Sequence, residues 1–305
     1  MDLVALVSAL PGSIAQGLIW GIMALGVYLT YKVLDLADLT VDGSIATGGA
    51  VAAVCILNGM DPMLSLVFAF IVGMVAGLAT GVLHTLMGIP AILAGILTQL
   101  ALYSINMRIM GKSNVSISVD KYDLVVSLRH INKSIVIALI FVAVIIALLY
   151  WFFGTELGSS IRATGCNENM ARAQGINTNF NKVLGLMLSN GLVGIAGGLY
   201  AQYQGNADVN MGRGAIVIGL AAVIIGIVLG EAIIGKYFNF AARLCVIVLG
   251  AIIYYIVIAI VLQLGLSTTD LKLFSALIVA LFLALPYLKG RYFSTRARKG
   301  GNKNA

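Results

Sequence analysis

Residues 62–107 read PMLSLVFAFIVGMVAGLATGVLHTLMGIPAILAGILTQLALYSINM, and none of these 46 residues carries a formal charge. A helix that crosses a lipid bilayer needs only about 20 apolar residues, so this stretch is too long for one crossing. Pro90 breaks it, because the residue before a proline avoids the helical conformation. We therefore predict two membrane-spanning helices joined by a tight turn at LMGIP (86–90).

The whole chain has the composition of an integral membrane protein. It is 60% hydrophobic and 10% charged over 305 residues, with a mean hydropathy of +1.02, which is outside the range of soluble domains. Its three cysteines form no CxxC or Cys/His cluster, so neither a disulfide framework nor a metal site is predicted. Six of the 19 Lys and Arg residues lie in the last 17 positions. The net charge of +7 therefore indicates a cytoplasmic end and not a nucleic-acid surface.

Charges, prolines and Asn/Asp/Gly clusters divide the chain into apolar segments. We expect an all-α, polytopic membrane bundle of about nine helices, with a range of eight to ten. Lys and Arg are more frequent in the connections on the side of the C-terminus, which favours an external N-terminus and a cytoplasmic C-terminus. We treat 1–290 as one transmembrane domain and 291–305 as a basic cytoplasmic tail. The nine segments are 12–31, 41–58, 62–86, 90–107, 134–153, 183–204, 214–230, 243–263 and 272–288.

The second segment follows an unusual group of acids in DLADLTVDGSIATGGA (35–50). We expect Asp35 and Asp38 to be solvated loop charges and Thr40 to cap the next helix, with Asp42 in its first turn, where the helix dipole favours an anion. Because GSIATGGA is small and rich in glycine, we expect a short or discontinuous helix near 41–58, and favour the discontinuous form. Asp42 either caps this helix or also meets the substrate.

Two connections are long enough to have structure of their own. In the external one, 111–133, apolar and polar residues alternate from Asn114 to Val119, which predicts an extended piece. In the internal one, 154–182, the run CNENMARAQGIN predicts a short helix that Asn167 caps and Gly175 ends. A short, charged helix suits docking to a cytoplasmic partner; a solvated connector is the alternative.

Several spans carry glycines at four-residue spacing. Such faces let helix backbones approach closely in lipid. Three roles are open for these glycine faces: packing of helices within one bundle, contact between two subunits of a dimer, or a surface along which helices slide. The glycines are Gly17 and Gly21, Gly73, Gly77 and Gly81, Gly194 and Gly198, and Gly226 and Gly230.

The motifs of several enzyme classes are missing from the sequence. GEAIIGKY (230–237) resembles a nucleotide-binding P-loop, but Tyr237 stands where the motif needs Ser or Thr for magnesium, and a membrane span precedes it. HExxH, GxSxG and paired intramembrane carboxylates do not occur. A proton-coupled carrier would have only His84 and Asp42 available. We therefore expect a chain that is not an enzyme and binds no cofactor itself.

Three stretches of the sequence resemble a known family, the permease subunits of bacterial ABC importers allied to the branched-chain amino-acid and ribose permeases. The closer resemblance is to the subgroup associated with tryptophan and tyrosine uptake. The stretches are GLIWGIMALGVYLTYKVLDLADLTVDGSIATGGAVAA (17–53), IPAILAGILTQLALYSINMRIMGKSNVSI (89–117) and GSSIRATGCNENMARAQGINTNFNKVLGLMLSNGLVGIAGGLYAQYQG (158–205).

The resemblance implies a multi-pass protein of the bacterial inner membrane that works as a dimer, surrounded by lipid. ATP and magnesium would bind to a separate ATP-binding subunit, whose closure switches the permease between its two openings. An external binding protein would deliver the substrate, implied to be an amino acid and, from the subgroup, an aromatic one. Residues 158–179 would hold the coupling helix that docks into the ATP-binding subunit. Its residues would be Arg162, Gly165, Glu168, Asn169, Ala171, Arg172 and Gly175.

Polar side chains within apolar spans are costly, so they face either a path or another helix. Both readings stay open for Gln99 and Asn190. The resemblance places DLADLTVDGSIATGGA beside the path as well. Our candidates for the translocation path are Asp42, Gln99, Asn106, Asn190 and Gln202, with Thr98, Ser104, Ser189 and Gln204 as further polar residues of the same spans.

Two other functions fit a polytopic membrane protein. A secondary transporter of a small polar solute would work without an ATPase and would depend on a mid-membrane acid. A small channel or a lipid-handling enzyme would act without ATP.

Overall fold

The computed structural model describes residues 3–119, 121–235 and 239–263, and six further positions between 273 and 284. This part of the chain is almost entirely helical, with ten α-helices and two three-residue strands. The expected all-α class is confirmed. Most of the ninth expected segment, 272–288, and the whole tail, 291–305, lie outside the described residues.

Six of the described helices are long and apolar enough to cross a membrane. Two further apolar helices accompany them, so eight of the nine expected segments are helical. The turn between α3 and α4 lies where Pro90 predicts it. The six helices are α1 (Leu3–Tyr28), α3 (Pro62–Thr85), α4 (Ala91–Met110), α5 (Ile131–Gly154), α8 (Thr178–Gln204) and α10 (Phe240–Gln263), and the two further ones are α2 (Val41–Leu57) and α9 (Ala215–Ile234).

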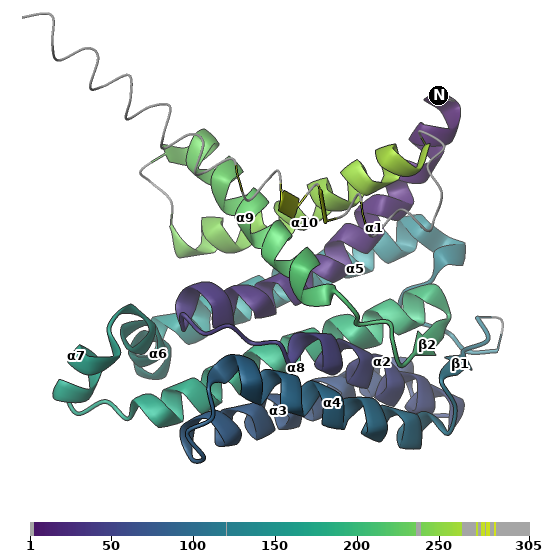
Figure 1. The fold of residues 1–305 in the computed structure, drawn as a ribbon. Helices are drawn as coiled ribbons and strands as arrows, with labels where there is room; N and C mark the ends of the chain where they lie inside the picture. Colours follow the sequence, from purple (N-terminus) through teal and green to yellow (C-terminus); the bar gives the residue numbers. More distant parts are fainter. Residues whose placement is uncertain are drawn as a thin grey trace, which may run out of the picture.

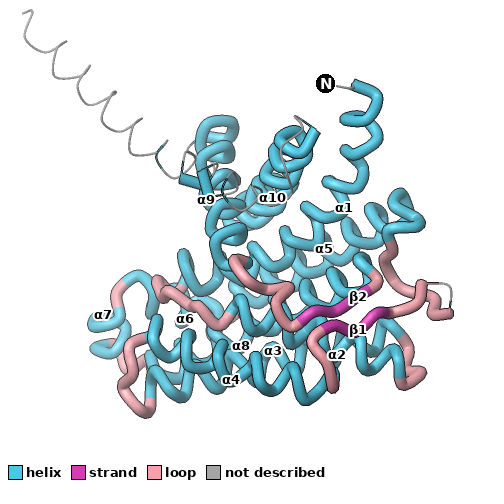
Figure 2. Tube along the Cα trace, turned by 45° about the vertical axis from the view of Figure 1, so that its right-hand side comes forward, coloured by secondary structure: helices cyan, strands magenta, loops and turns pink. Residues whose placement is uncertain are grey.

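The two connections with structure of their own lie at opposite ends of the bundle (Figure 1). One end carries α6 (Glu156–Cys166) and α7 (Glu168–Ala173). The other carries β1 (Asn114–Ser116), which pairs antiparallel with β2 (Asn206–Asp208), as Figure 2 shows. The extended piece expected within 111–133 is confirmed, and its partner is the segment that follows α8. Below, these are the α7 end and the strand end.

Helix α2 is short, as expected, but it is not broken. GSIATGGA forms one continuous helix with its flanks, so the favoured interruption within 41–58 is wrong. The non-helical residues come earlier: α1 widens into a π-helical turn, η1 (Leu29–Val33), and residues 34–40 then lead into α2. The glycines are used for contact instead, since a side chain on Gly48 would strike the backbone of Gly194 in α8.

Glycine faces bring the helices into close contact. Gly73 and Gly77 of α3 lie against the backbone of α8 at Asn190 and Leu186. Gly17 of α1 lies against Ile252 of α10 in the same way. The interpretation as packing within one bundle is confirmed at these contacts and at Gly21, Gly81, Gly194, Gly198 and Gly226.

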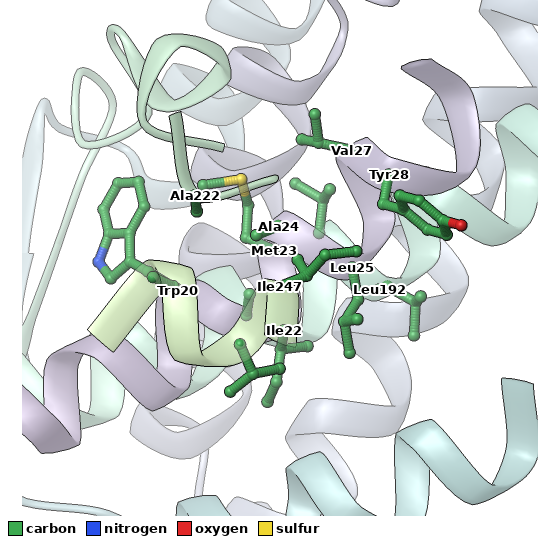
Figure 3. Packing of buried hydrophobic residues seen from close by; sticks show 14 of the residues in the cluster. Trp20, Ile22, Met23, Ala24, Leu25, Val27, Tyr28, Leu192, Ala222 and Ile247 are labelled. Atoms are coloured by element: carbon green, nitrogen blue, oxygen red, sulfur yellow. The ribbon is translucent and has the colours of Figure 1, made fainter. Parts of the chain in front are cut away.

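Helix α1 runs through the centre of the bundle. Its residues Ile22 and Leu25 are fully buried, and Figure 3 shows them among Leu192 of α8, Ala222 of α9 and Ile247 of α10. Helices α4 and α5, by contrast, expose many large apolar side chains, as expected of surfaces that face lipid.

Candidate functional site

The loop at the α7 end folds largely as its sequence predicts. The side chain of Asn167 accepts a hydrogen bond from the Met170 N–H at 3.0 Å and so caps α7. Gly175 ends the turn with φ +81°, a left-handed conformation that favours glycine. The short capped helix is therefore confirmed by local geometry.

Glu168 is the centre of an ion cluster within this loop. Its carboxylate accepts hydrogen bonds from Arg172 Nη2 at 2.7 Å and from Lys182 Nζ at 2.8 Å. The Arg172 Nε also donates to Thr178 Oγ1 at 2.8 Å. The pKa of Glu168 is lowered, and the largest cause is the hydrogen bond from Lys182. These bonds fasten α7 to the first turns of α8, so the two charges that we expected to face a partner are engaged within the chain.

Other predicted coupling residues also contact their own chain. Ala171, one of the residues that the resemblance assigns to the coupling helix, is buried. Gly165 lies against the Val33 carbonyl at the end of η1, where a side chain would not fit. Arg162 donates from Nη2 to the Phe153 carbonyl at 2.8 Å. Asn169 remains exposed.

A second polar group lies between the helices, where α2 begins. We call it the paired network; it consists of Asp38, Thr40, Ser44, Thr80, Thr98 and Asn190. Asn190 Nδ2 donates to Asp38 Oδ2 at 2.7 Å, and Ser44 Oγ donates to Asn190 Oδ1 at 2.6 Å. The hydroxyl oxygens of Thr40 and Thr80 are 2.6 Å apart, and the Thr80 hydroxyl donates to Thr98 Oγ1 at 2.9 Å. The network joins α2, α3, α4 and α8.

The paired network corrects two expectations. Asp38 is not a solvated loop charge: it is 3% exposed, and its other oxygen accepts from the Thr40 N–H at 2.9 Å. Thr40 occupies the cap position of α2 but makes no capping hydrogen bond, because its hydroxyl is used by Thr80. Since Asn190 lies near the middle of the 27-residue α8, the Asp38 turn reaches deep between the helices. Asp35 is exposed, as expected.

Asn190 and Gln202 both tie helices together. Asn190 is fully buried and bonded at both amide atoms. Gln202 Nε2 donates to the Pro62 carbonyl at 3.0 Å, and its Oε1 accepts from the Val125 N–H at 3.0 Å. Neither side chain lines the pocket described below.

Asp42 caps a helix, but a different one from its own. Its Oδ2 accepts from the Gly214 N–H at 2.9 Å and its Oδ1 from the Ile216 N–H at 2.8 Å, both at the start of α9. The carboxylate therefore meets the positive end of a helix that begins beside the first turn of α2. Figure 1 shows the start of α9 close to α2 in the interior of the bundle. Gly212 permits the approach, because a side chain there would strike the Asp42 carbonyl.

Three of the five predicted path residues line one pocket of about 290 Å³ beside α4. Asp42 contributes from α2, and Gln99 and Asn106 from α4. Asn106 is 1% exposed, and neither its Nδ2 nor its Oδ1 has a hydrogen-bond partner among the described residues. We call this the α4 pocket; its polar and aromatic lining is Asp42, Gln99, Tyr103, Asn106, Asn210 and Arg213.

Three lining residues, Tyr103, Asn210 and Arg213, were not among the predicted path residues. Tyr103 could have been found, because residues 99, 103 and 106 follow the spacing of one helix face. Asn210 and Arg213 come from the segment between β2 and α9, and no local signal places that segment against α4.

Comparison with known proteins identifies the family. The family model described as "Branched-chain amino acid transport system / permease component" matches residues 10–286. This chain belongs to that permease family. It is 41% identical to the tyrosine transport system permease protein of Clostridioides difficile (strain R20291), over 95% of this chain and 96% of that protein. An uncharacterised protein of Rickettsia prowazekii is 32% identical over 91% of this chain and 96% of its own length. The D-allose transport system permease protein AlsC of Escherichia coli (strain K12) is 29% identical over 62% of this chain and 58% of that protein.

The chain is thus the permease component of an ABC-type transporter and a multi-pass protein of the bacterial inner membrane. Permease components of this family are not themselves catalytic. Membership also implies two partners, an ATP-binding subunit and a substrate-binding protein.

Proposed function

We propose that this permease forms the path of an ATP-driven importer and couples it to the ATP-binding subunit through the loop at the α7 end. The main support for this proposal is that the polar loop at the α7 end exposes large apolar side chains. Met170 of α7 is 62% exposed, and Phe180 in the first turn of α8 is 53% exposed. Exposed apolar groups of this kind are typical of a surface that another protein covers.

The ion cluster around Glu168 supports the same proposal. It fastens α7 to α8, so a push on α7 reaches α8 and, through Asn190, the paired network. In this view Glu168 and Lys182 transmit the movement, while Met170, Asn169 and Arg172 form the contact. Ala171, being buried, supports α7 from behind.

Co-purification tests the coupling surface. We expect Met170→Asp to reduce recovery of the co-expressed ATP-binding subunit at least about tenfold, because a charge would enter an apolar contact. Asn132→Asp is a suitable control, since it adds the same charge at an exposed position beside the start of α5, at the strand end. Equal recovery with both variants, or uptake by the permease without any ATPase, would contradict the proposal.

We further propose that the substrate is an amino acid with an aromatic side chain. The support is the tyrosine permease relative, which matches nearly the whole of both chains. A second copy of this chain would complete the path. The binding protein would dock at the strand end, where Lys112, Lys121 and Lys133 are exposed and would attract acidic side chains. Uptake of labelled tyrosine into proteoliposomes that contain all the subunits tests the substrate.

A further inference from the structure

The α4 pocket contains a buried polar group that makes no hydrogen bond to the described part of the chain. Neither amide atom of Asn106 has a partner among the described residues, although the side chain is 1% exposed. A buried amide without partners loses the hydrogen bonds that water gave it, which costs free energy. A ligand can supply the missing hydrogen bonds, and Asn106 lines a pocket that could hold one.

The size of the pocket limits the ligand to a small molecule. Its volume of about 290 Å³ is at the lower end of the range for small-molecule sites. Gln99 and Asn106 lie seven residues apart on α4, so their backbones are separated by roughly 10 Å along the helix axis. An extended amino acid with a six-membered ring fits this length.

The two formally charged residues of the α4 pocket, Asp42 and Arg213, lie at the end of the pocket near Gln99. Asp42 is in the first turn of α2, beside Gln99, and Arg213 precedes the start of α9. Both line the pocket, as does the ring of Tyr103 on α4. Each carboxylate oxygen of Asp42 accepts one backbone hydrogen bond and can accept another. A carboxylate and a guanidinium together complement the ammonium and carboxylate groups of a free amino acid.

We propose that the α4 pocket binds the transported amino acid itself, and that Asn106 recognises a hydroxyl group at the far end of its side chain. This inference rests on the proposed function. Asp42 and Arg213 hold the charged groups, the ring of Tyr103 flanks the ring of the substrate, and the Asn106 amide pairs with the phenol. Phenylalanine would leave Asn106 unpaired, so the pocket prefers tyrosine.

Protection of a cysteine tests this inference on the permease in complex with its ATP-binding subunit, in lipid nanodiscs. Cys55, Cys166 and Cys245 are first replaced by alanine, and Asn210→Cys then places one thiol at the exposed rim of the pocket. We expect 10 mM L-tyrosine to slow the reaction of this thiol with a charged methanethiosulfonate reagent severalfold. A single hydrogen bond corresponds to roughly tenfold in affinity, so L-phenylalanine should protect at correspondingly higher concentration.

Two variants make the result specific. With Asn106→Leu, tyrosine should protect the thiol at position 210 no better than phenylalanine does. A cysteine at the exposed position 112 should react with the reagent at the same rate whichever amino acid is present. Equal protection by both amino acids in the presence of Asn106, or a thiol at position 210 that is unreactive without ligand, would overturn the inference. If the thiol is not protected but ATP-dependent tyrosine uptake persists, the inference fails and the proposed function stands. If neither the ATP-binding subunit nor tyrosine uptake is found, the proposed function itself fails.

Discussion

Two buried asparagines, Asn190 and Asn106, lie in polar groups on either side of the first turns of α2 and differ in one respect. In the paired network, Asn190 is bonded at both amide atoms. In the α4 pocket, Asn106 is bonded at neither, among the described residues. The same residue type is therefore a structural tie in one place and an open recognition group in the other. Hydrogen-bond partners, and not burial, distinguish the two.

The difference also indicates what each group does. The paired network fixes the non-helical turn before α2, which would otherwise leave backbone and carboxylate groups unpaired in an apolar interior. In the α4 pocket, Asn106 makes no hydrogen bond to the described residues, which suits a group that recognises a ligand.

The largest expected effect comes from replacing the paired asparagine. Asn190→Leu removes the Nδ2 donor to Asp38 and leaves Thr40 as the remaining partner of this buried carboxylate among the described residues. We expect a loss of roughly 3 kcal/mol in the free energy of unfolding, since a buried carboxylate that loses a hydrogen-bond donor is strongly destabilising. Thermal unfolding of the purified permease in detergent measures it.

Asn106→Leu is the matched control for this comparison. Because it removes an amide that has no partner among the described residues, we expect the melting temperature to be unchanged or raised. If both leucine variants destabilised equally, the distinction between the two groups would be wrong.

A smaller effect is expected at Asp42, which lines the α4 pocket and caps α9. Asp42→Asn keeps one acceptor for the start of α9 but loses the second and the negative charge. We expect a loss of about 1–2 kcal/mol, the usual range for a helix cap with a favourable dipole. The variant also weakens the hold on an ammonium group, so tyrosine protection at position 210 should fall. A variant with wild-type stability would show that the α9 cap contributes nothing.

The smallest effect is expected at Glu168, whose bonds lie partly in water. The lowered pKa of Glu168 means that its ion cluster stabilises the loop above the ordinary pKa, about 4.3, and is lost as pH falls through the lowered value. Glu168→Gln should therefore cost at most about 1 kcal/mol at neutral pH. The difference in melting temperature between wild type and variant should be constant from pH 8 to 5 and then narrow. If the difference in melting temperature grew as the pH fell, the stabilising role given to the ionised Glu168 would be wrong.

Local signals in the sequence were sufficient for much of the fold. Pro90 placed the turn between α3 and α4, and Asn167 and Gly175 placed the ends of the loop around α7. The alternation after Asn114 indicated β1. Each of these features depends on residues that are close together in the chain, because caps, turns and periodicity act over a few residues.

The candidate sites were predicted less completely. The sequence proposed five path residues, of which Asp42, Gln99 and Asn106 line one pocket. The other two, Asn190 and Gln202, bond to other segments of the chain instead.

The sequence treated Asp38 as solvated, because an acid in a predicted connection is ordinarily exposed, and here α8 covers it. The buried position of Ala171 could not be read from its small size, which suits contact with a partner and contact with its own chain equally.

By itself the sequence determined that this protein is a helical membrane protein, where most of its long helices begin and end, and that α2 is short. Those properties follow from apolar length and from local backbone chemistry. The sequence did not determine the start of α1, which lies at Leu3 and not near residue 12. Only the tertiary structure decided which polar groups are satisfied. Asp38 meets a donor 152 positions away and Asp42 meets backbone groups more than 170 positions away. Hydrogen bonds between distant segments depend on how the helices pack in three dimensions, and a linear pattern of residues does not contain that information.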